Sequence, residues 1–173
     1  MLTKNYQTQD ELIFQTLDEL VPEDHLVRQL DTVDYTFIYK LVEDLYSEDG
    51  RPSIDPIMLF KILTIKYVFN IKSLRKTMKE IEVNLAYRWF IKLPLSQKVP
   101  HYTVISYNFN NRFNKDLLGE RILLNIFQQI IDLDIVNIKD IDLSKLSLKA
   151  YQTPQDRTKL ILDETLLYVK PLL

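Results

Sequence analysis

Glycine is almost absent from this chain, which has only Gly50 and Gly119 among its 173 residues. Tight hairpin turns need positive φ angles, which glycine adopts most readily. A protein built from many β-hairpins is therefore excluded, and so are the glycine-rich loops that cradle nucleotide phosphates. Because 46% of the residues are hydrophobic, a chain of this length is expected to bury the core of a folded domain.

The spacing of apolar residues predicts a mainly α fold. Residues 34–46 carry an amphipathic helical stripe, and residues 55–70 are apolar almost all round, as a central buried helix would be. Asp55 and Pro56 form an N-cap and first-turn pair that opens this second helix. Asn70 is suited to close it in the left-handed conformation.

Other helices are predicted from capping residues and stripes. Glu23 and Asp24 supply the first turn of a short helix that ends at Leu30, whereas residues 1–22 fit a strand or a helix. The remaining predicted helices are 73–82 capped by Ser73, 85–91 capped by Asn84, 104–114 capped by Thr103, and 116–132. We expect a helical domain with helix-turn-helix-like elements over 1–133 and a divergent tail over 134–173. The tail is irregular or weakly β at 141–148, with a last helix at 158–169.

Charge is distributed very unevenly along the chain. Residues 51–115, here called the basic segment, hold twelve Lys or Arg and three acids, a net charge of +9, although the whole chain is −2. Residues 1–50 hold three bases and twelve acids, a net charge of −9. Such a cationic stretch suits a polyanionic partner such as nucleic acid. Two alternatives stay open: the cations solvate helix faces, or the acidic N-terminal segment packs against them.

The helices of the basic segment resemble the parts of a helix-turn-helix, in which one helix enters the major groove. A row of cations holds phosphates, while Asn and Arg side chains contact base edges. We predict phosphate contacts at Lys72, Arg75, Lys76, Lys79, Arg88 and Lys92, and further DNA contacts at Ser73, Thr103 and Lys115. His101 either contacts a phosphate or ends a loop. We predict base contacts at Asn108, Asn111 and Arg112, on the helix capped by Thr103. Tyr87, Trp89 and Phe90 either stack on bases or, as is commoner in such a short helix, join the core.

Several chemistries have no residues to support them. The chain lacks cysteine, which removes disulfides, thiolate metal sites and cysteine nucleophiles. His25 and His101 are the only histidines and have no ligand-spaced partner, so we expect no metal site and no cofactor. The N-terminal residues do not read as a signal peptide, and no apolar run approaches the roughly 20 residues of a membrane span. We expect a soluble cytoplasmic protein.

Four stretches resemble the N-terminal, InsH-type domain of bacterial insertion-sequence transposases of the DDE, RNase-H-like class. They are VPEDHLVRQLD (21–31), FIYKLVEDLYSEDGRPSIDPIMLFKIL (37–63), IKSLRKTMKEIEVNLAYRWFIKL (71–93) and VPHYTVISYNFNNRF (99–113). The resemblance covers residues 20–133. It implies a helical domain that binds double-stranded DNA at the element's inverted-repeat ends, in a bacterial, nucleoid-associated protein.

The resemblance also implies that this chain is not itself an enzyme. In many relatives the catalytic domain opens with a motif like D-[GS]-T-H-[IL]-K-A, whose Asp holds Mg²⁺. The matching stretch here is SKLSLKA (144–150), with Ser144 in place of that Asp, and the chain ends at Leu173. We expect a truncated or recruited DNA-binding protein. The alternatives are a module that dimerises with full-length transposase through the N-terminal segment or helix 116–132, and a metal nuclease using Asp140, Asp142 and Asp163.

Overall fold

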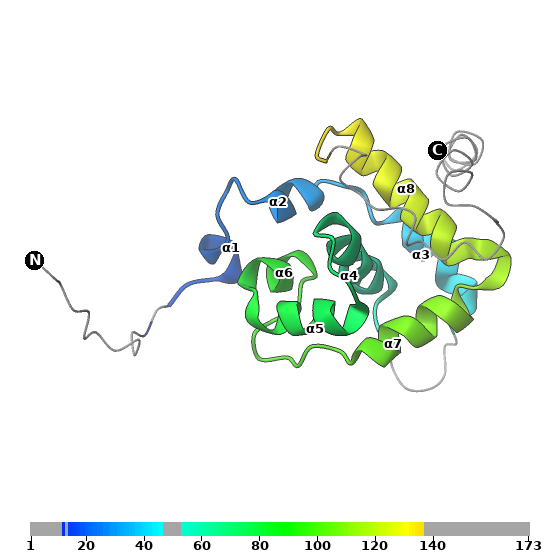
Figure 1. The fold of residues 1–173 in the computed structure, drawn as a ribbon, viewed down its shortest axis with the longest axis horizontal. Helices are drawn as coiled ribbons and strands as arrows, with labels where there is room; N and C mark the ends of the chain where they lie inside the picture. The colour runs from blue at the N-terminus through cyan, green and yellow to red at the C-terminus, as the bar shows by residue number, and fades with distance from the viewer. Residues whose placement is uncertain (1–11, 13, 47–52, 137–173) are drawn as a thin grey trace, which may run out of the picture.

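The computed structural model describes residues 12, 14–46 and 53–136, and every regular element among them is helical (Figure 1). The α-helices are α1 (Leu17–Leu20), α2 (Leu26–Leu30), α3 (Phe37–Val42), α4 (Pro56–Val68), α5 (Leu74–Val83), α6 (Leu85–Phe90), α7 (Tyr102–Tyr107) and α8 (Leu118–Asp132). Short turns of other helix types follow α3 (η1, Glu43–Leu45), follow α7 (η2, Asn108–Arg112) and precede α8 (η3, Lys115–Leu117). The prediction of a mainly α fold is confirmed.

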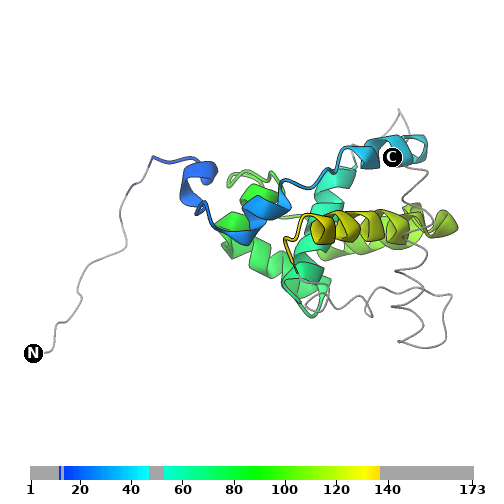
Figure 2. The same ribbon diagram turned by 90° about the horizontal axis from the view of Figure 1, so that it is seen from above.

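Helix α4 lies in the middle of the molecule, with α5 and α6 to one side and α3 and α8 to the other (Figures 1 and 2). Every side chain from Leu59 to Ile65 is buried, as the apolar sequence of this helix predicts. The Asp55 carboxylate accepts a hydrogen bond from the Met58 backbone N–H at 3.0 Å, so the predicted N-cap is confirmed. The core is therefore built around one buried helix rather than between two layers.

Two further predicted caps fix the next pair of helices. The Ser73 hydroxyl accepts from the Lys76 N–H, which starts α5, and the Asn84 side chain accepts from the Tyr87 N–H, which starts α6. Because Asn84 is also the residue that ends α5, the chain turns between the two helices at a single residue. Helix α5 consequently packs against α6, and also against α4 and α7.

Three helices end with a non-glycine residue in the left-handed conformation. Asn70 after α4, Lys92 after α6 and Asp134 after α8 have φ angles of 49°, 58° and 53°. At each, the next residue donates its N–H to a carbonyl five positions back, the longer bond of a Schellman motif. The prediction for Asn70 is confirmed. Because the chain has only two glycines, residues with larger side chains take the left-handed position after these three helices.

Some predicted boundaries are wrong by a few residues. Helix α2 starts at Leu26, where His25 Nδ1 caps the Val27 N–H, so Glu23 and Asp24 precede the helix instead of forming its first turn. Helix α7 starts at Tyr102, so Thr103 is not its N-cap. Thr103 lies inside the first turn because His101, with an extended backbone (φ −70°, ψ 140°), occupies the N-cap position.

Helix α8 closes the core with one apolar face that includes Ile122, Ile126 and Ile130. Its second residue is Gly119, where an added Cβ would stand 2.9 Å from Cε2 of Phe109 in η2. This glycine therefore allows close approach of two helical segments. Residues 47–52 and the predicted strands and last helix of the tail lie outside the described residues.

Candidate nucleic-acid interface

Four cations on and just before α5 are all exposed. These residues, here called the α5 basic row, are Lys72, Arg75, Lys76 and Lys79. Met78 and Ile81 are buried on the other side of the helix, which at 3.6 residues per turn directs the row outward. Within the described ranges, no acid forms an ion pair with any member of the row. None of the four cations is therefore held in an ion pair with a described acid.

Described acids of the N-terminal segment contact a different part of the basic segment. Asp31, at the end of α2, accepts from Nζ of Lys61 at 2.5 Å and from Nζ of Lys92 at 2.8 Å. Asp18 of α1 accepts from the Trp89 indole N–H at 2.9 Å. These contacts attach α1 and α2 to α4 and α6. The acids of α1 and α2 thus meet α4 and α6 and leave the α5 basic row uncovered.

Lys61 is a structural cation. Only 6% of the residue is exposed, and its ammonium lies 4.7 and 5.0 Å from the ring centroids of Phe90 and Tyr35. It also donates to the Phe90 carbonyl at 3.1 Å. Burial lowers the pKa of the Lys61 ammonium, and the hydrogen bond with Asp31 opposes that shift. Lys61 therefore contributes to the sequence count of bases but not to any surface.

Arg88 was predicted to hold a phosphate, and the structure corrects that placement. The residue is only 7% exposed. Its Nη1 donates to the carbonyl oxygens of Pro94 and Gln97 at 3.0 and 3.2 Å. The guanidinium points into the loop that follows α6 because that loop offers carbonyl acceptors. Arg88 organises the loop and has no surface to offer a phosphate.

Lys92 lies at the edge of the candidate interface. Its ammonium binds Asp31 and lies 4.3 Å from the Trp89 ring centroid, while 58% of its side chain stays exposed. Trp89 is half-buried and also carries the Arg28 guanidinium at 4.8 Å. Tyr87 and Phe90 are buried. For these two aromatic residues the core interpretation is therefore confirmed.

The polar face predicted at 104–114 is present only in part. Asn108 is buried, and its side-chain amide donates to the Val104 carbonyl at 2.8 Å, so it cannot reach a base edge. Asn111 remains exposed, although its amide nitrogen donates to the Tyr107 carbonyl. Tyr107 itself is 67% exposed. The π-type turn η2 redirects the residues after Tyr107, which the regular helical spacing did not predict.

Two cations follow at the end of this segment. Arg112 is half-buried: its Nη1 donates to the Ser53 hydroxyl at 2.7 Å, and its guanidinium lies 4.3 Å from the Tyr46 ring centroid. It ties η2 to the residue stretch before α4. Lys115 is exposed. The Arg112 guanidinium is therefore partly occupied by contacts within the protein, and Lys115 is more accessible to a ligand.

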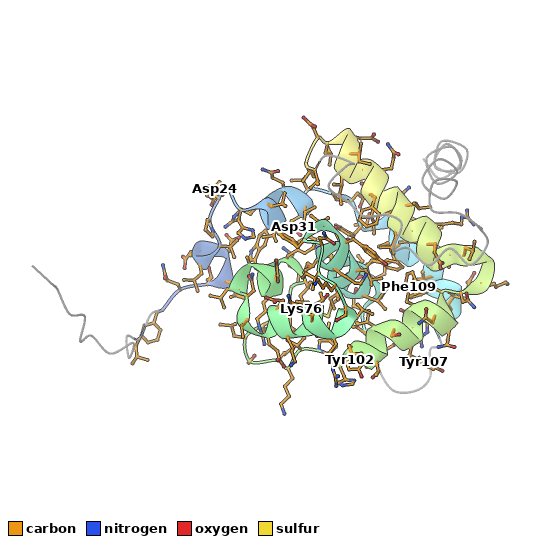
Figure 3. All side chains as sticks on the ribbon, in the orientation of Figure 1. Asp24, Asp31, Lys76, Tyr102, Tyr107 and Phe109 are labelled. Atoms are coloured by element: carbon orange, nitrogen blue, oxygen red, sulfur yellow. The ribbon has the colours of Figure 1, made fainter. Side chains whose placement is uncertain are left out.

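His101, Tyr102 and Arg75 meet where α7 begins beside α5. The rings of His101 and Tyr102 have centroids 4.3 Å apart, and the Arg75 guanidinium lies 5.4 Å from the Tyr102 centroid. His101 Nδ1 is 2.7 Å from the Thr103 hydroxyl. Figure 3 labels Tyr102 at the start of α7, next to the helix that carries Lys76. Tyr102 was not among the predicted site residues, because it precedes the predicted helix 104–114 and no pattern in the sequence indicated this contact.

No group of three potential metal ligands comes together in the described part of the chain. The acids Asp140, Asp142 and Asp163, and the stretch 144–150, lie outside it. No helix among the described residues combines the length and apolarity needed to cross a bilayer.

The described residues form a small helical domain with a row of four exposed cations on and just before α5. A comparison with known protein families matches residues 15–111, more than half of the chain, to the family described as Transposase domain (DUF772). The chain belongs to this transposase domain family. The match runs from just before α1 into η2, so it includes the whole α5 basic row. No curated protein and no solved structure matches the chain.

Proposed function

We propose that this chain binds double-stranded DNA, at the inverted-repeat ends of a mobile element or at an operator, and has no catalytic site of its own. Membership of a transposase domain family supports the nucleic-acid partner. The Ser at position 144, where related catalytic domains have a metal-binding Asp, supports the second part. The InsH-type resemblance supplies the expected target.

The observation that carries this proposal is the α5 basic row, which is exposed and has no ion-pair partner among the described acids. Uncompensated cations on one rigid helix attract the phosphate backbone and release its counterions on binding. The row spans about two helical turns from Lys72 to Lys79, or roughly 11 Å of helix axis. That length is enough to meet more than one phosphate of a single strand.

The neighbouring residues of α7 and η2 supply groups that contact DNA without large charge. Tyr107, at the end of α7, and Asn110 and Asn111, in η2, are exposed, and Lys115 follows them in the chain. Asparagine amides pair with adenine edges in the major groove. In this proposal the α5 basic row sets affinity, and the α7–η2 surface contributes to base preference. Arg88 and Asn108 have no part in it.

The test is binding of a labelled duplex by fluorescence anisotropy over a range of salt concentrations. Affinity is expected to fall steeply with salt, with a log–log slope of about −0.9 per phosphate neutralised. Lys76→Glu combined with Lys79→Glu is expected to abolish binding or to reduce that slope by about two units. Lys40→Glu is the matched control, because Lys40 is an exposed lysine of α3, away from α5 (Figures 1 and 2).

Duplex binding that does not change with salt, or equal losses in the Lys40 control and the double variant, would contradict the DNA-binding proposal. The proposed lack of a catalytic site has a separate test. Purified protein with Mg²⁺ is expected to leave supercoiled plasmid intact. Nicking that disappears in Asp142→Ala would instead indicate a metal nuclease.

A second candidate function, dimerisation with another copy or with full-length transposase, is favoured by a different observation. Leu12 and Phe14, in the stretch before α1, are 89% and 98% exposed. Large apolar side chains left this open are commonly covered in a complex. Helix α8, the other expected dimerisation element, uses its apolar face in the protein's own core. The N-terminal stretch is therefore the better candidate for a protein contact.

Light scattering coupled to size exclusion tests this candidate over a range of protein concentrations. A dimer that dissociates in Phe14→Asp but persists in Leu133→Asp would support it, since Leu133 is also exposed but lies at the end of α8. A monomer at all concentrations would contradict self-association. If function survives charge reversal at Lys76 and Lys79, the relevant partner is protein rather than DNA.

A further inference from the structure

A small hollow lies between α5 and the residues that lead into α7. Its volume is about 230 Å³, and its lining comes from about two turns of α5 and from residues 99–102. This volume is smaller than the roughly 300–1,000 Å³ of pockets that hold drug-sized ligands. The hollow is therefore suited to a single planar group rather than to a whole nucleotide chain or a large cofactor.

The walls of the hollow differ in chemical character. Met78 is 6% exposed, and Val99 and Pro100 are half-buried, so the floor is apolar. The Tyr102 ring stands at one side, tilted by 43° against the ring of His101. An aromatic side above an apolar floor favours a flat ligand that can stack and be removed from water. A bare phosphate would gain nothing from either.

Charged groups surround this apolar floor at the rim. Arg75 and Lys79, two members of the α5 basic row, line the hollow together with the Glu82 carboxylate. The two cations suit a phosphate next to the stacked group, and the carboxylate can accept a hydrogen bond from an exocyclic amine. A nucleobase on a phosphodiester chain combines the features that this hollow favours: a flat ring, amino groups and neighbouring phosphates.

We propose that this hollow binds one unpaired DNA base that projects from the duplex held by the α5 basic row. The inference rests on the DNA-binding function proposed above and specifies its substrate class: duplex DNA with an extrahelical nucleotide. The base stacks on Tyr102, and its amino edge faces Glu82. The backbone phosphates on either side of this nucleotide contact Arg75 and Lys79. Extrusion is least costly for a base that has no pairing partner.

Two labelled duplexes, identical except for a single-nucleotide bulge, test the inference with the full chain. The bulged duplex is expected to bind more tightly, on the order of tenfold, because base–aromatic stacking is lost without it. With 2-aminopurine as the bulged base, its fluorescence is expected to be quenched on binding as it stacks. Both readouts use the unmodified protein and do not depend on any variant folding.

Tyr102→Leu is expected to remove the quenching and the preference for the bulge, so that the ratio of the two affinities falls to about one. Tyr102→Phe is expected to retain both. Tyr107→Leu is the matched control, since Tyr107 is an exposed tyrosine of the same helix outside the hollow; the ratio of the two affinities should not change.

The outcomes separate the two proposals. Salt-dependent binding of both duplexes with equal affinity, or a preference that survives Tyr102→Leu, overturns the base-binding hollow and leaves the DNA-binding function in place. An absence of binding to both duplexes at low salt overturns both. Quenching that is unchanged in Tyr102→Leu also rejects the hollow as the site of the base.

Discussion

Gly119 lies directly against the ring of Phe109, and this contact sets how closely α8 approaches the segment after α7. A Cβ at position 119 would stand 2.9 Å from Phe109 Cε2 and 3.2 Å from Cβ of Phe113. Real Cβ contacts are essentially never as short as 2.9 Å, so any larger residue at 119 must displace Phe109.

Gly119→Ala is therefore expected to destabilise the protein by about 1 kcal/mol in urea unfolding. Overpacking costs roughly 1–3 kcal/mol, and the better helix propensity of alanine offsets up to about 1 kcal/mol of it. The same substitution in a Phe109→Leu background should cost less, because the smaller side chain can yield. A stabilising effect of Gly119→Ala would show that Phe109 moves aside freely.

Asp134→Gly is expected to stabilise the protein by about 0.5–1 kcal/mol. Asp134 ends α8 at a φ angle of 53°, where a residue with a Cβ is strained and glycine is not. Asp134→Ala is the control and should give no such gain, since alanine retains the Cβ. Equal midpoints for the glycine and alanine variants in thermal unfolding would argue against this explanation.

Asp31→Ala is expected to cost about 3 kcal/mol, because it leaves the buried Lys61 ammonium without its counter-charge. In a Lys61→Met background the same Asp31→Ala change should cost less than about 1 kcal/mol. Methionine fills the space of the lysine stem and needs no counter-charge. Urea unfolding of the four proteins of this cycle gives the coupling energy; a value near zero would contradict the assigned role of Lys61.

Stability is expected to fall as the pH rises above 10. Burial raises the pKa of Tyr67 to about 12, and a hydrogen bond to Asp55 raises the pKa of Tyr39 to about 12. Since an unfolded tyrosine ionises near 10, the folded state holds more protons between pH 10 and 12, and its stability is lost over that window. The lowered pKa of Lys61 has the opposite effect on stability below pH 10.5, because there the folded state holds fewer protons at this group than the unfolded state does. Lys61 is one group, whereas two tyrosines act in the other direction.

Tyr67→Phe isolates one part of this pH effect. The variant should lose less stability between pH 8 and pH 11 than the parent protein does, by up to about 1 kcal/mol. Guanidinium unfolding at the two pH values measures the difference. An identical pH dependence in both proteins would mean that Tyr67 ionises normally in the folded state.

Helix starts that depend on short-range chemistry were predicted well. Asp55, Ser73 and Asn84 each cap a helix whose first N–H groups are only two or three residues away. A cap of this kind needs no knowledge of the rest of the fold. The buried character of α4 followed equally directly from a sequence that is apolar on every side.

Predictions that required the direction of a long side chain were less successful. Arg88 and Asn108 have the residue types of a DNA contact, yet each turns inward to backbone carbonyls that only the folded chain brings close. Asp31 joins Lys61 and Lys92 across 30 and 61 residues of sequence. The opposite charges of the two segments allow such ion pairs, but the charge counts do not indicate which bases form them.

The burial of α5 on three neighbours has a consequence for any polyanion that docks on its outer face. Since α4, α6 and α7 already hold the helix backbone in place, the conformational entropy of that backbone is lost when the protein folds, before a ligand arrives. Association then immobilises only a few lysine and arginine side chains. A polyanion that docks on this face would therefore meet a rigid template, and the shape adjustment required for a close fit would fall on the polyanion.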